Sequence, residues 1–282
     1  MRLLRYGIKG QEKPAILDEK DQVRDLSSII SDIDSTTLNF ALINKLQQLD
    51  LSTLPIVQNP HPIAACIGKV GKFICIGLNY KEHAKETGAK IPQEPIIFNK
   101  WTSAISGAND DVLLPRGSTH TDWEVELGVV IGKAGKYIAQ DEALSYVAGY
   151  CVVNDISERE YQSHRGGTWD KGKGCDTFGP IGPWLVTYDE IADPQKLELW
   201  LEVDGKRYQH GNTDDMIFSV KQLISYVSQF MSLQSGDIIS TGTPSGVGLG
   251  IKPDPIFLKA GQIMRLGIEK LGIQQQRVIS ED

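Results

Sequence analysis

One stretch of the chain, residues 123–131, constrains the fold more than any other. Its second half is rich in Val, Leu and Ile, which predicts a buried β-strand. Two carboxylates, Glu124 and Glu126, interrupt the first half. Side chains two residues apart in a strand point to the same face, so we expect both carboxylates side by side. Such like charges repel each other and lose hydration on burial. The stretch therefore predicts either a solvated outer face or a divalent cation bound between the two carboxylates.

A second apolar stretch, residues 147–155, ends on another carboxylate, Asp155. Residues 157–160 then fit the start of a helix, so Asp155 is expected where the chain leaves a sheet. Carboxylate oxygens suit Mg²⁺, Mn²⁺ or Ca²⁺ much better than Zn²⁺ or copper. The sequence thus predicts a metal site formed by Glu124, Glu126 and Asp155. We expect Mg²⁺ or Mn²⁺ there, with Ca²⁺ as a third option.

The composition is that of an ordinary globular protein. The 282 residues, 40% of them hydrophobic and 23% charged, suffice for one large domain and a small extension. A formal net charge of −7 argues against a nucleic-acid partner, because such proteins usually carry a basic patch. An anionic substrate remains compatible with this charge, since a bound cation can reverse its sign locally.

Cysteine usage and hydropathy indicate the cellular setting. Arg2 and Arg5 interrupt any early apolar run, and no apolar stretch is long enough for a transmembrane helix. We therefore expect no signal peptide, no membrane contact and a cytoplasmic location. The four cysteines contain no CxxC pair and are expected to be free thiols, mostly buried: Cys66, Cys75, Cys151 and Cys175.

The N-terminal part of the chain, residues 1–70, differs in pattern from the rest. Residues 3–8 and 14–17 resemble short strands, and leucines at helical spacing over residues 38–49 predict a helix with Ser35 as its candidate cap. A proline-rich linker follows at residues 58–62. We predict a small N-terminal α+β module over residues 1–70 and a larger domain over residues 71–282.

Short strands separated by glycine and proline dominate the larger domain. Strands are predicted at residues 73–76, 96–98, 197–203, 238–240, 264–268 and 273–278. Asp204-Gly205 and Gly272 mark two hairpin turns. One amphipathic helix is predicted over residues 220–231, after Ser219. The fold class is therefore mainly β, with some helix (α+β).

Three polar motifs allow a functional or a structural interpretation. His83 and Glu86 share one face of a predicted short helix, which suits a general base but also an exposed charged turn. In the predicted loop 167–176, two lysines flank Gly172 and could bind an anion or an enolate, or could be solvated. The glycine-rich segment 241–250 lacks the Gly-Lys-Ser/Thr ending of a phosphate loop, so it favours contact with a small substrate.

Six separated motifs together resemble one family. They are residues 76–83, 94–100, 122–127, 154–159, 171–173 and 241–244. In order and approximate spacing they are similar to the fumarylacetoacetate hydrolase superfamily over about residues 70–280. Residues 1–70 resemble the variable N-terminal part of bacterial members. The resemblance implies a β-roll or mixed β-sandwich catalytic domain, a homodimer and a divalent metal.

The resemblance also implies roles for individual residues. The implied metal ligands are again Glu124, Glu126 and Asp155. A His83–Glu86 dyad would activate water, and Lys173 matches the active-site lysine of the family. Four further side chains are implied to lie near the substrate: Lys100, Arg159, Gln162 and Thr243.

The chain departs at one ligand position from the eukaryotic enzyme that gives the superfamily its name. The namesake has a further aspartate seven residues before the histidine, where this chain has Ile76. We expect a water in its place, so the substrate of the namesake cannot be carried over. The runs that begin at Arg165 and Asp176 are most similar to members that cleave 2,4-diketo-3-deoxy sugar acids. Sequences of this kind are also named ureidoglycolate lyases.

The resulting hypothesis is a metal-dependent hydrolase that cleaves the C3–C4 bond of a small 2,4-diketo acid of the acylpyruvate type. His83 would activate water, and the products would be pyruvate and a second acid. Three alternatives use the same metal site: a 2-oxo-4-enoate hydratase, an oxaloacetate-type decarboxylase and a ureidoglycolate lyase. A non-catalytic scaffold stabilised by metal is the alternative from another class. It would require neither His83 nor Lys173.

Overall fold

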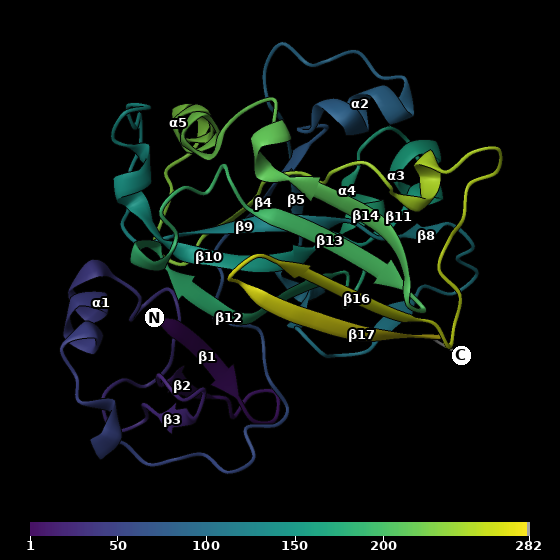
Figure 1. The fold of residues 1–282 in the computed structure, drawn as a ribbon. Helices are drawn as coiled ribbons and strands as arrows, with labels where there is room; N and C mark the ends of the chain where they lie inside the picture. Colours follow the sequence, from purple (N-terminus) through teal and green to yellow (C-terminus); the bar gives the residue numbers. More distant parts are fainter. Residues whose placement is uncertain (281–282) are drawn as a thin grey trace.

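Two β-sheets form the framework of the protein (Figure 1). The structure, a computed structural model, describes residues 1–280. The larger sheet has the order β3-β2-β1-β12-β10-β9-β15-β4-β5, with β6 paired to β12. Its strands are β1 (Arg2–Tyr6), β2 (Lys13–Leu17), β3 (Val23–Asp25), β4 (Phe73–Gly77), β5 (Ile96–Lys100), β6 (Ile105–Gly107), β9 (Val125–Ile131), β10 (Val147–Asn154), β12 (Gly179–Thr187) and β15 (Ile238–Ser240). The pairs β4–β15 and β6–β12 are parallel, and the other pairs are antiparallel.

The second sheet contains both predicted hairpins. Its order is β14-β13-β16-β17-β7. The strands are β7 (Val112–Leu114), β13 (Glu198–Val203), β14 (Lys206–Asn212), β16 (Ile263–Ile268) and β17 (Gly272–Ser280). Asp204 and Gly205 both have positive φ angles, 50° and 77°, as the tight turn between β13 and β14 requires. A separate pair is formed by β8 (Thr121–Asp122) and β11 (Ser157–Glu158). The predicted mainly β fold is confirmed.

Five α-helices connect the strands in residues 1–280, and two of them correct the sequence predictions. They are α1 (Phe40–Gln47), α2 (Lys81–Thr87), α3 (Arg159–His164), α4 (Asp170–Lys173) and α5 (Val220–Phe230). The cap of α1 is Asn39, whose side chain accepts a hydrogen bond from the Leu42 N–H, and not Ser35. The predicted loop 167–176 contains the short helix α4. None of the helices within residues 1–280 has the length and hydropathy needed to cross a membrane.

The core lies on both faces of the larger sheet. Residues 125, 127, 129 and 131 of β9 point to the second sheet and pack with apolar side chains of β13, β16 and α5. In Figure 1 the second sheet lies in front of β9, β10 and β12. Val130 points to the opposite face and belongs to a second cluster, which includes Leu42 and Ile43 of α1. Glu126 shares the face of Val130, so its carboxylate lies on the side away from the second sheet.

The N-terminal segment extends the larger sheet. β1 pairs antiparallel with β12, and β2 and β3 continue the sheet beyond it. Figure 1 shows β1, β2, β3 and α1 together at one end of the molecule. The division into a module of residues 1–70 and a domain of residues 71–282 stays a prediction about independent folding.

Candidate metal centre and active site

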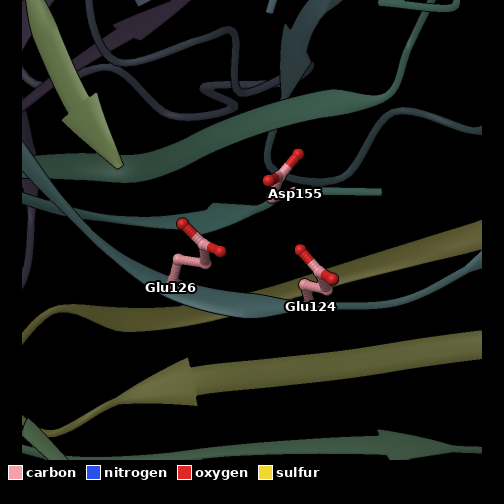
Figure 2. A group of neighbouring side chains, drawn as sticks. All are labelled: Glu124, Glu126 and Asp155. Carbon is pink, nitrogen blue, oxygen red and sulfur yellow. The ribbon is translucent and has the colours of Figure 1, made fainter. Parts of the chain in front are cut away.

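Three buried carboxylates meet where β9 begins and β10 ends. Glu126 lies opposite Val153 in the β9–β10 pair, and the Asp155 N–H donates to the Glu124 carbonyl oxygen at 2.9 Å. One carboxylate oxygen from each residue lies within 4.8 Å of the others. Figure 2 shows Glu124 and Glu126 along one stretch of the chain with Asp155 beside them. The structure thus brings the three predicted ligands together. Glu124 lies just before β9, not within the strand as predicted, because its N–H bonds to the Asn154 side chain.

Three basic side chains from distant parts of the sequence surround this group. Lys173 Nζ donates to Glu124 Oε2 at 2.7 Å and to Asp155 Oδ2 at 2.8 Å. Lys100 Nζ lies 2.5 Å from Asp155 Oδ1. Arg159 forms an ion pair with Glu124 Oε1 at 2.7 Å. The site therefore contains a dense network of opposite charges on buried side chains.

The charges act differently on the two glutamates. Burial alone would raise the pKa of the Glu124 carboxyl, but the charges of Lys173 and Arg159 outweigh it and hold this pKa well below its usual value. Burial raises the pKa of the Glu126 carboxyl well above its usual value, and the neighbouring Asp155 and Glu124 raise it further. Glu126 thus has less compensating positive charge nearby than Glu124 has.

A divalent cation fits this donor set. All three side chains offer hard oxygen ligands, which Mg²⁺ and Mn²⁺ prefer. In residues 1–280 no Lys or Arg forms an ion pair with Glu126. Its Oε2 accepts hydrogen bonds from Ser240 Oγ at 2.6 Å and from the Gly242 N–H at 2.9 Å. These donors fix the carboxylate without supplying a full positive charge. A bound cation would supply it, and Glu124, Glu126 and Asp155 would hold the ion.

The predicted dyad forms on α2. His83 Nδ1 lies 3.1 Å from Glu86 Oε2, and Glu86 Oε1 accepts a hydrogen bond from the Gly246 N–H at 2.8 Å. Asn79 anchors the chain just before α2, because its side chain donates to the carbonyl oxygens of Phe218 and Thr241. Since Nδ1 faces a carboxylate, Nε2 is the ring nitrogen left to accept a proton.

A cavity of about 80 Å³ joins the dyad to the carboxylates. The predicted site residues that line it are His83, Glu124, Glu126, Arg159, Gln162, Lys173 and Thr243. Glu86 and Asp155 lie behind this lining and contact His83 and Lys173.

Lys100 does not line the cavity. Its side chain is buried, and Nζ donates to Asp155 Oδ1 and to the Ile156 carbonyl oxygen. In this structure Lys100 holds a metal-ligand candidate in place. Its contact with substrate stays a prediction.

The sequence interpretation missed two side chains of this site. Trp169 lines the cavity and packs against Phe98 with ring centroids 5.2 Å apart. A Cβ on Gly77 would come within 2.4 Å of the Trp169 ring, so any larger residue there would force the ring to shift. Asp122 is fully buried and accepts hydrogen bonds from Arg159 Nε and from the Gly248 and Leu249 N–H groups. In the sequence, the available signal was a carboxylate directly before Trp123 and the apolar run that follows it.

Comparison with known proteins decides the family. Residues 72–279 match the model of the fumarylacetoacetate (FAA) hydrolase C-terminal family. The chain belongs to this family. The match starts at the beginning of β4, so it covers the metal centre, the dyad and the whole cavity.

Relatives in this family carry different activities in their names. A protein of Burkholderia lata, provisionally named a hydrolase, is 61% identical over 276 residues that cover 98% of both chains. The structure of a 2-hydroxyhepta-2,4-diene-1,7-dioate isomerase from Mycobacterium marinum has a TM-score of 0.74 and 30% identity, and covers 100% of this chain and 99% of its own. A maleylpyruvate hydrolase from Sphingobium sp. SYK-6, solved with manganese(II) and pyruvate, has a TM-score of 0.82 and 26% identity over 100% of both chains.

Proposed function

We propose that the protein is a metal-dependent hydrolase that cleaves the C3–C4 bond of a 2,4-diketo acid to give pyruvate and a second acid. One observation carries the proposal. A single cavity brings together a three-carboxylate site, a His–Glu dyad and two basic side chains, Lys173 and Arg159. Hydrolysis of such a bond needs an activated water and positive charge for an enolate, and these groups can supply both.

The dyad would perform the proton transfer. His83 Nε2 takes a proton from water, while Glu86 holds the Nδ1 hydrogen and stabilises the charged imidazole. The hydroxide adds to the C4 carbonyl carbon, the C3–C4 bond breaks, and its electron pair forms the enolate of pyruvate. The proton held by His83 is then available for C3.

The charged groups would stabilise the anions. When bound by Glu124, Glu126 and Asp155, a divalent cation supplies Lewis-acid charge for a keto oxygen. Lys173 and Arg159 add positive charge on the same side of the cavity. In the described structure both are paired with Glu124, so a cation on that carboxylate would leave their charge available to an anionic substrate.

Two relatives support this proposal. The Sphingobium enzyme is named a maleylpyruvate hydrolase and was solved with manganese(II) and pyruvate. The Burkholderia lata protein is also named as a hydrolase.

The test is pyruvate release from a panel of 2,4-diketo acids. The protein should release one pyruvate per substrate consumed, lose this activity in EDTA and recover it with Mg²⁺ or Mn²⁺. Rescue by Zn²⁺ alone would contradict the all-oxygen site. Substrate consumption without pyruvate would contradict C–C cleavage.

An isomerase is the second candidate. The Mycobacterium marinum structure carries an isomerase name at 30% identity over the full chain. An isomerase would use His83 to move a proton between two carbons and would not need an activated water. The two reactions separate in H₂¹⁸O, because only hydrolysis places ¹⁸O in the second acid.

We further propose a homodimer, because closed two-fold dimers are the commonest soluble oligomers.

A further inference from the structure

A buried glutamine of the second sheet contacts the strand that carries the metal ligands. Gln209 lies on β14 and is 0% exposed. Its Oε1 accepts a hydrogen bond from the Val125 N–H at 2.9 Å. Its Nε2 donates to Thr243 Oγ1 at 2.8 Å and to the Pro244 carbonyl oxygen at 2.9 Å. All three contacts are thus directed at β9 and at the segment that follows β15.

These contacts close a ring around Val125. Thr243 Oγ1 donates to the Val125 carbonyl oxygen at 2.9 Å, so the ring runs from Val125 N–H through Gln209 and Thr243 back to Val125. The ring uses the only hydroxyl hydrogen of Thr243 and therefore fixes the orientation of that side chain in the cavity. Both backbone polar groups of Val125 are satisfied by it.

The ring replaces a missing strand partner. β15 pairs with β9 from Val130 only as far as Gly128, where Ser240 is the partner. The Thr241 N–H adds one more bond to the Leu127 carbonyl oxygen, and the chain then turns away at Gly242. Without Gln209, the Val125 N–H would be buried without a hydrogen-bond partner, which destabilises the folded backbone at this point. This backbone unit lies directly between Glu124 and Glu126.

We propose that Gln209 is a positioning residue that sets the relative placement of Glu124 and Glu126 and the orientation of Thr243. The inference rests on the metal centre of the proposed function. Gln209 does not line the cavity. It acts through the backbone of Val125 and through the Thr243 hydroxyl, so its loss should change how well the carboxylates converge on a cation.

Gln195 provides a matched control. Its Oε1 accepts from the Val220 N–H at 2.6 Å, and its Nε2 donates to the Thr213 carbonyl oxygen at 2.8 Å. The Gln195 amide therefore forms the same kind of hydrogen bonds with the backbone as Gln209. These bonds hold the N-terminus of α5 and not β9, and Gln195 does not line the cavity. A methionine is close to glutamine in size and cannot replace these hydrogen bonds.

The experiment compares Gln209→Met and Gln195→Met with the unchanged protein. Thermal unfolding of the metal-free proteins and calorimetric titration with Mn²⁺ are measured for all three. Both variants should unfold at lower temperature. Only Gln209→Met should bind Mn²⁺ more weakly, by about 10- to 100-fold, the range found when a side chain that supports a metal ligand is removed. Gln195→Met should stay within about twofold of the unchanged protein.

Several results would overturn the inference. Equal Mn²⁺ affinity in Gln209→Met and the unchanged protein would reject the positioning role and leave the metal centre intact. An equal loss of Mn²⁺ affinity in both variants would show that Gln209 only stabilises the fold and does not position the carboxylates. Absence of Mn²⁺ binding in the unchanged protein would remove the metal centre and this role with it. If Gln209→Met does not fold, Thr243→Val opens the same ring from the other side, and unchanged Mn²⁺ affinity there would also reject the proposal.

Discussion

Replacement of Glu126 by glutamine should have opposite effects on the metal-free and the metal-loaded protein. Glu126 Oε2 accepts hydrogen bonds from Ser240 Oγ and from the Gly242 N–H. The amide oxygen of glutamine can accept both, and the side chain keeps its size. The substitution therefore removes one negative charge and little else, so we expect Glu126→Gln to fold.

In the metal-free protein the variant should become more stable relative to the unchanged protein as the pH rises. Burial, Asp155 and Glu124 raise the folded-state pKa of Glu126 above its unfolded value. The stability that this difference contributes is present below the unfolded pKa and is lost as the pH rises through the folded pKa. For every tenfold change in the acid dissociation constant, the free energy changes by about 1.4 kcal/mol. Glutamine does not titrate, so the variant does not lose this contribution. Between pH 5 and pH 8 the free energy of unfolding of the unchanged protein should therefore fall relative to that of the variant.

With bound metal the order of stability should reverse, so that the unchanged protein is more stable than the variant. A ligand at 100 times its Kd stabilises a protein by about 2.7 kcal/mol. At roughly 2 °C per kcal/mol for a chain of this size, this raises the Tm by about 5 °C. Loss of a direct ligand should weaken binding at least as much as loss of a supporting side chain, about 100-fold, which is about 2.7 kcal/mol. Glu126→Gln should therefore lose most of the Tm increase at that Mn²⁺ concentration.

The assay is thermal unfolding of EDTA-dialysed proteins at pH 5 and pH 8, with and without Mn²⁺. Glu124 is present in both proteins, so its own pH dependence largely cancels in the comparison. A variant that is less stable than the unchanged protein at pH 8 without metal, yet is stabilised equally by Mn²⁺, would refute both the electrostatic argument and the ligand assignment.

Three further predictions concern the dyad, the cavity wall and the assembly. His83→Asn should lower kcat by about 10²- to 10⁴-fold and leave the Mn²⁺ affinity unchanged, because within residues 1–280 the ring forms its hydrogen bond with Glu86 and none with Glu124, Glu126 or Asp155. A parallel loss of Mn²⁺ affinity would contradict this. Gly77→Ala places a methyl group 2.4 Å from the Trp169 ring, so it should cost about 1–3 kcal/mol in unfolding free energy and raise KM; an unchanged Tm and KM would show that Trp169 moves freely. Light scattering should give twice the chain mass of 31.1 kDa, and a single species at the chain mass would reject the dimer.

The sequence predicted what depends on local periodicity. The alternation of residues 124–131 placed Glu124 and Glu126 on one face, and the spacing of His83 and Glu86 placed them within 3.1 Å. The turn at Asp204-Gly205 and the helix after Ser219 were also predicted correctly, because their signals lie in a few adjacent residues.

The sequence did not predict the cap residue of α1 or the contacts between distant segments. Asn39 caps α1 because its side chain reaches the Leu42 N–H, and the leucine spacing alone could not choose between it and Ser35. The ion pairs that Lys100 and Lys173 form with Asp155 join residues up to 55 positions apart. Gln209 lies in a strand with hardly any apolar residue, so no hydrophobic pattern marked its side as buried.

The pairing of β1 with β12 has a consequence for synthesis on the ribosome. The Thr187 N–H donates to the Met1 carbonyl oxygen, and these residues are 186 positions apart. β1 therefore leaves the ribosome long before β12, the strand with which it pairs. Meanwhile the apolar side chains Leu3, Leu4 and Ile16 have no sheet to cover them. Nascent chains of this protein should thus expose the apolar side chains of β1 and β2 until β12 has been made.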